Sequence, residues 1–373
     1  MEPKIRLLIN VGDVRRGKTL GVAHFASNLI SEVETRPDVQ LTLIGANDVV
    51  HSYSTGACET IDLESVRSQK AKSNLIRKND LMLQIHHFLD RPIDVPTMTI
   101  VHDLHLFNVA WKYDGGYVAL HDRFTDNLTN SQFIVSEFPG TVSALKQRFP
   151  ELASKIHAID SPTLLSDYPL TEGCCDQSVI DLRLGDAVPT VLYPAQFQAH
   201  KNHWNLLAAI AILRDRCTPV RLILTGSMFR AYMMASIEAR VTQLGLEDLV
   251  IFAGYVEGDV LRDLYSRVDG VISPSMAEGG AYIAQEAIVH GRPVTCSSLE
   301  SVQAHLAKLE VQIPLFDPFD VISIADAIWE IVSNGATVVS GSSRAIELEQ
   351  SWSWQVVVDQ LLKIAQQLST QTT

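Results

Sequence analysis

Short apolar runs alternate with longer stretches of helical periodicity along most of the chain. The runs are rich in Val, Ile and Leu, as strands are when both faces of a parallel sheet are buried. They lie at residues 5–10, 40–45, 81–86, 97–103, 132–136 and 155–160 in the first half, and at residues 190–194, 221–226, 249–254, 270–275 and 293–297 in the second. Strands that alternate with helices predict β-α-β units, so we expect an α/β protein.

One helix between two of these runs has a clear pattern. In residues 203–216, five apolar side chains fall at helical spacing, which predicts one buried face against a sheet. These side chains are Trp204, Leu207, Ala208, Ala211 and Ile212. Asn202 precedes the helix, where we expect it to act as the N-cap.

The length of the chain, 373 residues, predicts two domains rather than one core. Residues 167–189 have no clear periodicity and contain Pro, Gly and Asp, which favours a linker there. We therefore expect two Rossmann-like, doubly wound domains, residues 1–170 and 188–350, joined by a linker at 171–187. Residues 351–373 are expected to form a final helix and a tail.

Charge is unevenly divided along the chain. Residues 1–170 contain 17 basic and 20 acidic residues, a net charge of −3, whereas the rest contains 13 and 23, a net charge of −10. Such a balance disfavours nucleic acid as a partner. The nearly neutral first half keeps open a peripheral association with an anionic membrane surface.

No apolar run reaches the ~18–20 residues that cross a bilayer, and the first residues leave no room for the apolar region of a signal peptide. We therefore expect a cytoplasmic protein, with association at the inner face of the membrane as the alternative. The five cysteines are odd in number and show neither CxxC nor regular spacing to histidine, so no metal site and no disulfide framework is expected.

Two glutamates, Glu278 and Glu286, follow the run at 270–275 with seven residues between them. A carboxylate beside an anomeric carbon stabilises the oxocarbenium-like charge of glycosyl transfer, and a carboxylate also accepts a pair of hydroxyl hydrogen bonds. Backbone N–H groups that open a helix are candidates to bind sugar hydroxyls or diphosphate oxygens; here they belong to Gly279, Gly280 and Ala281. The alternative is that both glutamates are solvated charges favoured by the helix dipole.

A lysine, Lys201, follows the first strand of the second half in the sequence AHKNH. The departure of a nucleoside diphosphate needs positive charge, and no DxD metal motif occurs, so this lysine is a candidate to neutralise a diphosphate. An ordinary surface lysine before a helix is the alternative.

In the first half, His102 and Asp103 end a predicted strand, and ligands of doubly wound domains bind at such strand ends. A histidine satisfied inside the core is the alternative. The loop GDVRRGKTLGVAHF follows the first strand, and its glycines and basic residues, among them Arg15, Arg16 and Gly21, are suited to phosphate. A flexible basic surface loop explains the same residues, because no Walker or GxGxxG pattern is present.

In this order and spacing, the motifs resemble those of the GT-B-fold retaining glycosyltransferases of family 4, the glycosyl transferases group 1. The resemblance spans most of the chain, through LGVAHFASNLI, TIVHDLHLF, FIVSEF, YPAQFQAHKNHWNLL, DLVIFAGYV, the glutamate segment and PLFDPFDVISIADAIWEI. It implies two facing domains, with the C-terminal helix packing back on the first. It also implies metal-independent transfer of a sugar, with mannose as the first guess, from a GDP- or UDP-linked donor to a glycan, polysaccharide or lipid-linked acceptor, without a bound cofactor.

The resemblance implies a role for each matching residue. Glu278 would face the donor sugar, Glu286 would hold the ribose, Lys201 would neutralise the diphosphate and His102 would lie beside the sugar and acceptor. The loop with Gly21 would border the diphosphate, and Gly254 and Tyr255 would lie by the base. Asp103, Arg15 and Arg16 are candidates on the acceptor side.

Two departures from the family pattern keep alternatives open. Gln196 stands where the family often has an arginine, which leaves Arg15 or Arg16 as replacement cations, and GGAYI after Glu278 lacks the usual aromatic and proline. The alternatives are a UDP-sugar 2-epimerase on the same fold and a non-catalytic member that binds nucleotide sugar.

Overall fold

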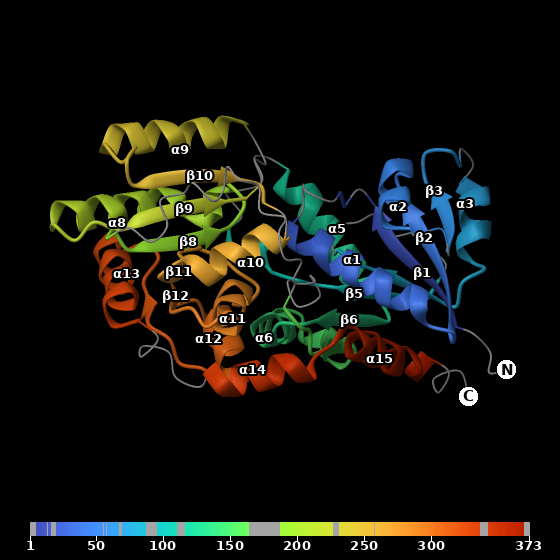
Figure 1. Cartoon of the computed structure of the whole chain (residues 1–373). Coiled ribbons are helices and arrows are strands. Elements are labelled where there is room, and N and C mark those ends of the chain that lie inside the picture. The colour runs from blue at the N-terminus through green and yellow to red at the C-terminus, as the bar shows by residue number, and fades with distance from the viewer. Residues whose placement is uncertain are drawn as a thin grey trace. The chain divides into compact units, whose positions relative to one another are not determined.

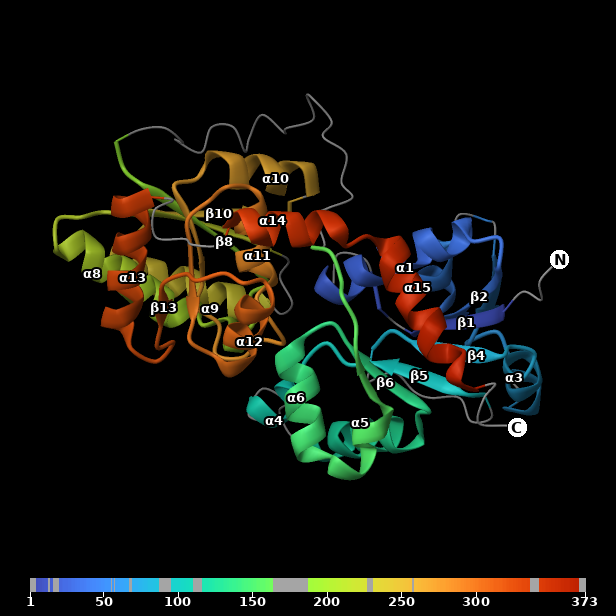
Figure 2. The same cartoon turned by 90° about the horizontal axis from the view of Figure 1, so that it is seen from below.

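The chain folds into two compact units, which Figures 1 and 2 show from two directions. Unit 1 comprises residues 1–164 and 352–373, and unit 2 comprises residues 165–351. The computed structural model describes residues 5–12, 14–15, 20–54, 56, 58–66, 69–86, 95–109, 116–163, 187–226, 231–256, 258–335 and 342–368. Residues 171–186 of the expected linker lie outside this described part.

Unit 1 contains a seven-stranded sheet in which every pair of neighbouring strands is parallel. Its order is β3-β2-β1-β4-β5-β6-β7. The strands are β1 (Ile5–Gly12), β2 (Val39–Gly45), β3 (Glu59–Asp62), β4 (Leu81–Gln84), β5 (Thr97–Ile100), β6 (Phe133–Ser136) and β7 (Ile156–Ala158). Six of them coincide with predicted runs. The sequence did not indicate β3, because this edge strand is polar and only partly buried.

The helices of unit 1 connect these strands, and the last one returns from the end of the chain (Figure 1). They are α1 (Leu20–Thr35), α2 (Asn47–Tyr53), α3 (Gln69–Ile76), α4 (His105–Asn108), α5 (Tyr117–Asn130), α6 (Pro139–Arg148), the 3-10 helix η2 (Pro150–Lys155) and α15 (Trp354–Ala365). The expected packing of the C-terminal helix on the first domain is confirmed.

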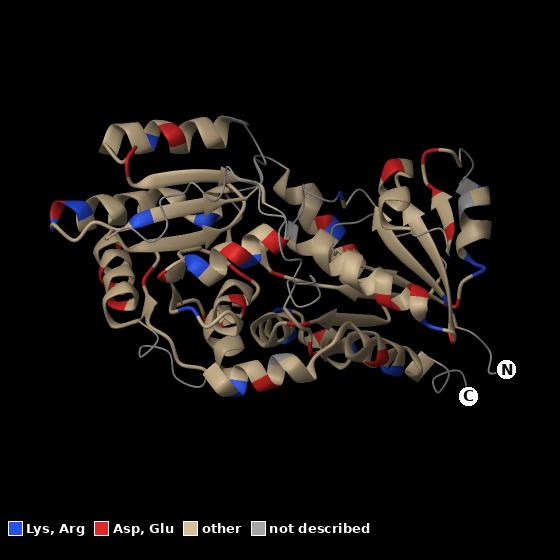
Figure 3. Cartoon of the chain, viewed as in Figure 1, with Lys and Arg blue, Asp and Glu red and all other residues tan. Residues whose placement is uncertain are grey.

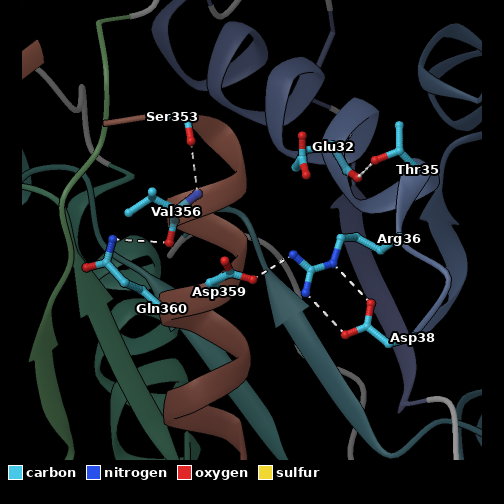
Figure 4. A network of polar contacts seen from close by, with 8 residues as sticks. All are labelled: Glu32, Thr35, Arg36, Asp38, Ser353, Val356, Asp359 and Gln360. Atoms are coloured by element: carbon cyan, nitrogen blue, oxygen red, sulfur yellow. Dashed lines mark hydrogen bonds and ion pairs between the residues drawn. The ribbon is translucent and has the colours of Figure 1, made fainter. Parts of the chain in front are cut away.

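Helix α15 is held to unit 1 by apolar burial and by two polar contacts, of which Figure 4 shows the one between Arg36 and Asp359. Arg36 donates to Asp38 at 3.0 Å and to Asp359 of α15 at 2.6 Å, and the Arg36 hydrogen bonds lower the pKa of Asp38. The Gln360 amide exchanges hydrogen bonds with the backbone of Asp160. Exposed ion pairs contribute about 1 kcal/mol or less, whereas each buried Val or Leu contributes about 1.5–3 kcal/mol. The apolar face of α15 therefore dominates its attachment.

Unit 2 contains a six-stranded parallel sheet in the order β10-β9-β8-β11-β12-β13. Its strands are β8 (Thr190–Pro194), β9 (Arg221–Thr225), β10 (Val250–Gly254), β11 (Gly270–Ser273), β12 (Val294–Ser297) and β13 (Leu315–Phe316). Its helices are η3 (Ala199–Lys201), α8 (His203–Asp215), α9 (Ala231–Leu244), α10 (Gly258–Arg267), α11 (Tyr282–Val289), α12 (Glu300–Lys308), α13 (Val321–Asn334) and α14 (Ser342–Ser351). The five predicted strands are present. Two residues of β13 were too few to produce a pattern.

The predicted buried face of α8 is correct in part, because Leu207 and Ala211 are buried, but it is wrong at Trp204. Trp204 is 48% exposed and donates to Ser236 of α9, whereas His203, Leu206 and Ile210 are buried. The helix lies between the sheet and its neighbours α9 and α13, so it is buried on more than one side. Because the sequence of α8 is apolar almost throughout, its pattern does not indicate which side of the helix is buried, and the prediction for Trp204 failed for this reason.

Figure 3 shows acidic and basic residues dispersed over the elements of both units. No helix in the described part of the chain is long and apolar enough to cross a membrane.

Candidate functional site

The strand order of unit 2 reverses between β8 and β11, because β9 and β10 lie on one side and β12 and β13 on the other. Ligands of such sheets bind outside the carboxyl ends of the strands at this switch point. Lys201 follows β8, and Glu278 follows β11, so the two loops that flank the switch point supply both residues. The Lys201 Nζ donates to the Glu278 Oε1 at 2.6 Å, with side chains 17% and 16% exposed.

Buried polar contacts join these two loops. Tyr193 of β8 donates its hydroxyl to the Lys201 carbonyl at 2.9 Å, and the same hydroxyl lies 3.1 Å from the Ser275 Oγ. Burial, together with the negative charge of Glu278, raises the pKa of Tyr193, so its hydroxyl stays protonated. The Met276 N–H donates to the His200 carbonyl at 2.7 Å. The relative position of the two loops is thus set by the fold.

Asn202 contributes to the same junction in a way that the sequence did not indicate. It occupies the N-cap position of α8 as expected, but its side chain makes no cap hydrogen bond, so the expected capping role is wrong. Its backbone is left-handed, with φ of 61°, and its Nδ2 donates to the carbonyls of Pro274 and Pro318 at 2.9 and 2.7 Å. Asn tolerates this backbone conformation better than most residues.

The glycines after Glu278 lead into α11, and this segment is anchored on α12. The Ala281 N–H, a candidate for sugar or diphosphate, donates instead to the His305 Nδ1 at 2.8 Å. The Ser301 hydroxyl donates to the Glu278 carbonyl at 2.7 Å. In this state the Ala281 N–H is therefore engaged within the fold, and Gly279 and Gly280 lie between the two anchored ends.

Glu286 lies in the middle of α11 and is buried. The Tyr265 hydroxyl donates to its Oε2 at 2.8 Å, and the Tyr265 ring stacks on His290 at 5.0 Å. Burial, followed by the charge of Glu286, raises the pKa of Tyr265. Tyr265 is fully buried. Its hydrogen bond to the carboxylate was missed, although a buried tyrosine hydroxyl usually has a polar partner.

Three other candidates lie at the carboxyl ends of β8 and β10. Gln196, at the expected arginine position, accepts at its Oε1 from the Gln198 Nε2 at 2.6 Å. The Gly254 carbonyl accepts from the Gly226 N–H at 2.7 Å, and Tyr255 beside it is 40% exposed. Gly226 has φ of 137°, and a Cβ there would lie 2.2 Å from the Ala195 carbonyl oxygen, so only glycine fits.

In unit 1, the carboxyl ends of β4, β5 and β6 meet at His102. Its Nδ1 lies 2.6 Å from the Glu137 Oε1, and its Nε2 lies 2.9 Å from the Ile85 carbonyl oxygen. Burial acts to lower the pKa of His102, but the charge and hydrogen bonds of its partners outweigh burial and raise it. Both ring nitrogens face acceptors, so the geometry suits an imidazolium ion.

The position of His102 beside a sugar stays a prediction, and both of its ring nitrogens have partners within the protein. Glu137, which the sequence did not single out, is buried, and its Oε2 has no hydrogen-bond partner among the described residues. It stands in the motif FIVSEF, but its pairing with His102 could not be read there, since the two residues are 35 positions apart.

The remaining candidates of unit 1 that the structure describes make contacts other than those of His102. Asp103 accepts at its Oδ1 from the His105 N–H at 2.9 Å, at the start of α4. Arg15 forms an ion pair with Asp48 of α2. Gly21 lies in the first turn of α1, and Arg16 lies outside the described residues. Within the described part of the chain, no group of three or more His, Cys, Asp or Glu could hold a metal ion.

The residues that match a known family lie within unit 2. Residues 180–347 match the family described as glycosyl transferases group 1. An uncharacterised glycosyltransferase of Methanocaldococcus jannaschii is 28% identical over 165 residues, 43% of this chain and 41% of that protein. A D-inositol 3-phosphate glycosyltransferase of Corynebacterium urealyticum is 24% identical over 246 residues, 65% of this chain and 58% of that protein. The chain thus spans about half the length of these curated relatives.

Solved structures are similar over nearly the whole chain. The sucrose-phosphate synthase of Thermosynechococcus elongatus has a TM-score of 0.72 at 18% identity, over 98% of this chain and 100% of that one. A protein of Anabaena solved in complex with UDP-glucose has a TM-score of 0.68 at 18% identity, again over 98% and 100%. At these identities the likeness concerns the fold, two α/β units with parallel sheets. The chain is therefore similar to the glycosyl transferases group 1 over residues 180–347, and it has the GT-B fold of two α/β units with parallel sheets.

Proposed function

We propose that this protein is a retaining, metal-independent glycosyltransferase, which moves a sugar from a nucleoside-diphosphate donor to a hydroxyl of a glycan, polysaccharide or lipid-linked acceptor. The contact between Lys201 and Glu278 at the switch point of unit 2 is the observation that carries this proposal. It brings together, from two loops, a cation suited to a leaving diphosphate and a carboxylate suited to an electron-poor sugar.

In the structure the two side chains neutralise each other. A diphosphate carries more negative charge than one carboxylate, so it competes for the Lys201 ammonium when a donor binds. Lys201 then stabilises the charge that develops on the leaving group. Glu278, released from its partner, faces the sugar, where its charge stabilises the oxocarbenium-like transition state.

Glu286 is proposed to hold the ribose hydroxyls of the donor. Its Oε2 accepts from Tyr265, which fixes the carboxylate in one orientation. A carboxylate offers about four lone-pair positions, so several remain for two hydroxyl donors. Because these contacts are the same before and during transfer, Glu286 contributes to donor affinity rather than to turnover.

Retention follows from attack on the same face as the leaving group. The acceptor oxygen forms its bond to the anomeric carbon as the bond to the diphosphate oxygen breaks, and the acceptor proton passes to that oxygen. No base on the opposite face is required. We assign acceptor binding to unit 1, with His102, Asp103 and Arg15 as its candidate contacts.

The first donors to test are UDP-glucose, because the similar Anabaena structure contains it, and GDP-mannose, because the sequence resemblance makes mannose the first guess. D-inositol 3-phosphate belongs in the acceptor panel, because it names the activity of a relative. Simple sugars and lipid-linked glycans complete that panel.

The decisive experiment measures nucleotide release and labelled product with the purified full chain. Lys201→Ala and Glu278→Ala should each lower kcat/KM by at least about 100-fold, whereas Lys363→Ala and Glu330→Gln, on exposed helix positions, should match the wild type. The proposal fails if no donor is bound or turned over, or if both site variants behave like the wild type. Conversion of a UDP-sugar without acceptor, followed by NMR, would identify an epimerase instead.

A further inference from the structure

Helix α12 presents two polar side chains to the segment that follows β11. Strand β12 pairs with β11, so α12, which begins three residues after β12, starts beside the loop that carries Glu278. Ser301 and His305 are four positions apart on this helix and therefore lie on the same face. One holds the carbonyl of Glu278, and the other holds the N–H of Ala281.

We propose that Ser301 and His305 are positioning residues, which clamp residues 278–281 in the conformation that receives the donor sugar. This inference rests on the proposed function of unit 2. Neither residue contacts the reacting atoms in the proposed mechanism. Their effect acts through the backbone on which Glu278, Gly279 and Gly280 are placed.

The chemistry of His305 suits such a clamp. Its Nδ1 accepts from a backbone N–H at 2.8 Å, so this nitrogen carries no proton and the ring is neutral. The side chain is buried, and burial lowers the pKa of His305 to about 3, with a smaller effect from Lys308. The ring also lies edge-on to Tyr282 at 5.9 Å. The acceptor is therefore present and fixed over the whole neutral pH range.

The segment needs an external anchor for two reasons. Ala281 is the N-cap of α11 but has no side chain that could accept from the N–H groups of the first turn, so the start of this helix lacks the usual local support. Gly279 and Gly280 lose more conformational freedom on ordering than other residues. Two hydrogen bonds from one rigid helix order the four residues before a donor arrives, which is preorganisation of the site.

The test uses variants that keep or remove each hydrogen bond in the full chain. His305→Leu removes the acceptor at similar volume, whereas His305→Asn can place its Oδ1 near the position of the Nδ1. Ser301→Ala removes the hydroxyl, and Ser301→Thr retains it. Gln303→Ala, on the exposed side of the same helix, is the matched control.

In kinetic assays with a donor that the wild type uses, His305→Leu and Ser301→Ala should lower kcat by about 10–100-fold, because a misplacement of about 1 Å can cost 100-fold. The Kd of the nucleoside diphosphate alone should change less than about threefold, since Lys201 and Glu286 keep their places. His305→Asn and Ser301→Thr should recover most of the loss. A loss of nucleotide and sugar binding in equal measure, or an impaired His305→Asn with the same kcat as His305→Leu, would overturn the clamp.

Amide hydrogen exchange tests whether the clamp exists, and this test does not require enzyme activity. Exchange at Ala281 should accelerate at least about tenfold in His305→Leu and stay near the wild-type rate in His305→Asn and Gln303→Ala. Unchanged exchange in His305→Leu would refute the clamp even if the enzyme is active. If the wild type transfers no sugar, the proposed function fails, and exchange still shows whether the clamp exists. Ser301→Ala, a small change at a partly buried site, serves if His305→Leu does not fold.

Discussion

The contact between Lys201 and Glu278 leads to an unusual expectation for nucleotide binding. Both side chains lie in the proposed donor site, yet their removal should have opposite effects on the Kd of a nucleoside diphosphate. Lys201 binds the diphosphate, whereas Glu278 competes with the diphosphate for Lys201 in the free protein. Lys201→Met should therefore weaken binding, and Glu278→Gln should strengthen it.

The magnitudes follow from the kind of interaction. A hydrogen bond to a charged group contributes about 1.5–3 kcal/mol, so Lys201→Met should raise Kd about 10- to 100-fold. The ion pair is mostly buried, with side chains 17% and 16% exposed, so we place its strength at about 1 kcal/mol, the upper end of the range for exposed pairs. In the Glu278→Gln variant the diphosphate does not have to break this ion pair when it binds, so its Kd should be about fivefold lower.

Isothermal titration of UDP and GDP into the wild type, the two single variants and the double variant measures these changes. In the Lys201→Met background, Glu278→Gln should lose most of its effect, because the competition no longer exists. High salt should reduce both effects, since it screens the charges. Weaker binding by Glu278→Gln, or the same gain with and without Lys201, would refute the reasoning. Glu330→Gln and Lys363→Met are controls for the charge change alone.

Three further predictions concern single side chains. Tyr265→Phe removes the hydroxyl that orients Glu286, so the Kd of UDP or GDP should rise about five- to tenfold, and an unchanged titration would contradict that role. Burial lowers the pKa of His203 to about 3, so below about pH 6.5 the unfolded state binds a proton that the native state does not bind. The free energy of unfolding should therefore fall by about 1.4 kcal/mol per pH unit as the pH drops from 6.5 towards 3. Thermal unfolding at pH 7 and pH 5 should show a smaller fall for His203→Leu than for the wild type. Leu361→Ala should destabilise unit 1 by about 2–4 kcal/mol but Asp359→Asn by less than about 1 kcal/mol in denaturant unfolding, and equal losses would show that the ion pair matters as much as the core.

The fold was predictable from the sequence where strands are buried on both faces. Continuous runs such as residues 190–194 can hardly be anything else between turns and amphipathic helices, and all eleven predicted runs contain a strand. Prediction failed where the hydrophobic pattern of a segment does not identify its structure or its buried side. The edge strands β3 and β13 are short or polar, and α8 is apolar on nearly every side, so its pattern did not reveal which face Trp204 occupies.

The candidate site divides in the same way. Lys201, Glu278 and Glu286 stand in sequence motifs, and a motif is recognised from a few consecutive residues. The residues that contact them in space cannot be recognised in this way, because the contacts of Tyr265 and His305 depend on which helices the sheet order brings together. Glu137 meets His102 only because β5 and β6 are neighbours. Sequence thus indicates which groups carry charge for the reaction, while the topology decides which groups orient them.

The attachment of α15 has a consequence for how the protein is made. Trp354, Val357 and Leu361 belong to the core of unit 1, although almost the whole of unit 2 precedes them in the chain. During synthesis from the N-terminus, residues 1–164 leave the ribosome first but lack part of their apolar core until the final helix follows. Unit 2 contains its own core and can fold earlier. We therefore expect the first-made unit to be completed last, and a chain that stops before residue 354 to leave that unit's apolar surface open to chaperones and proteases.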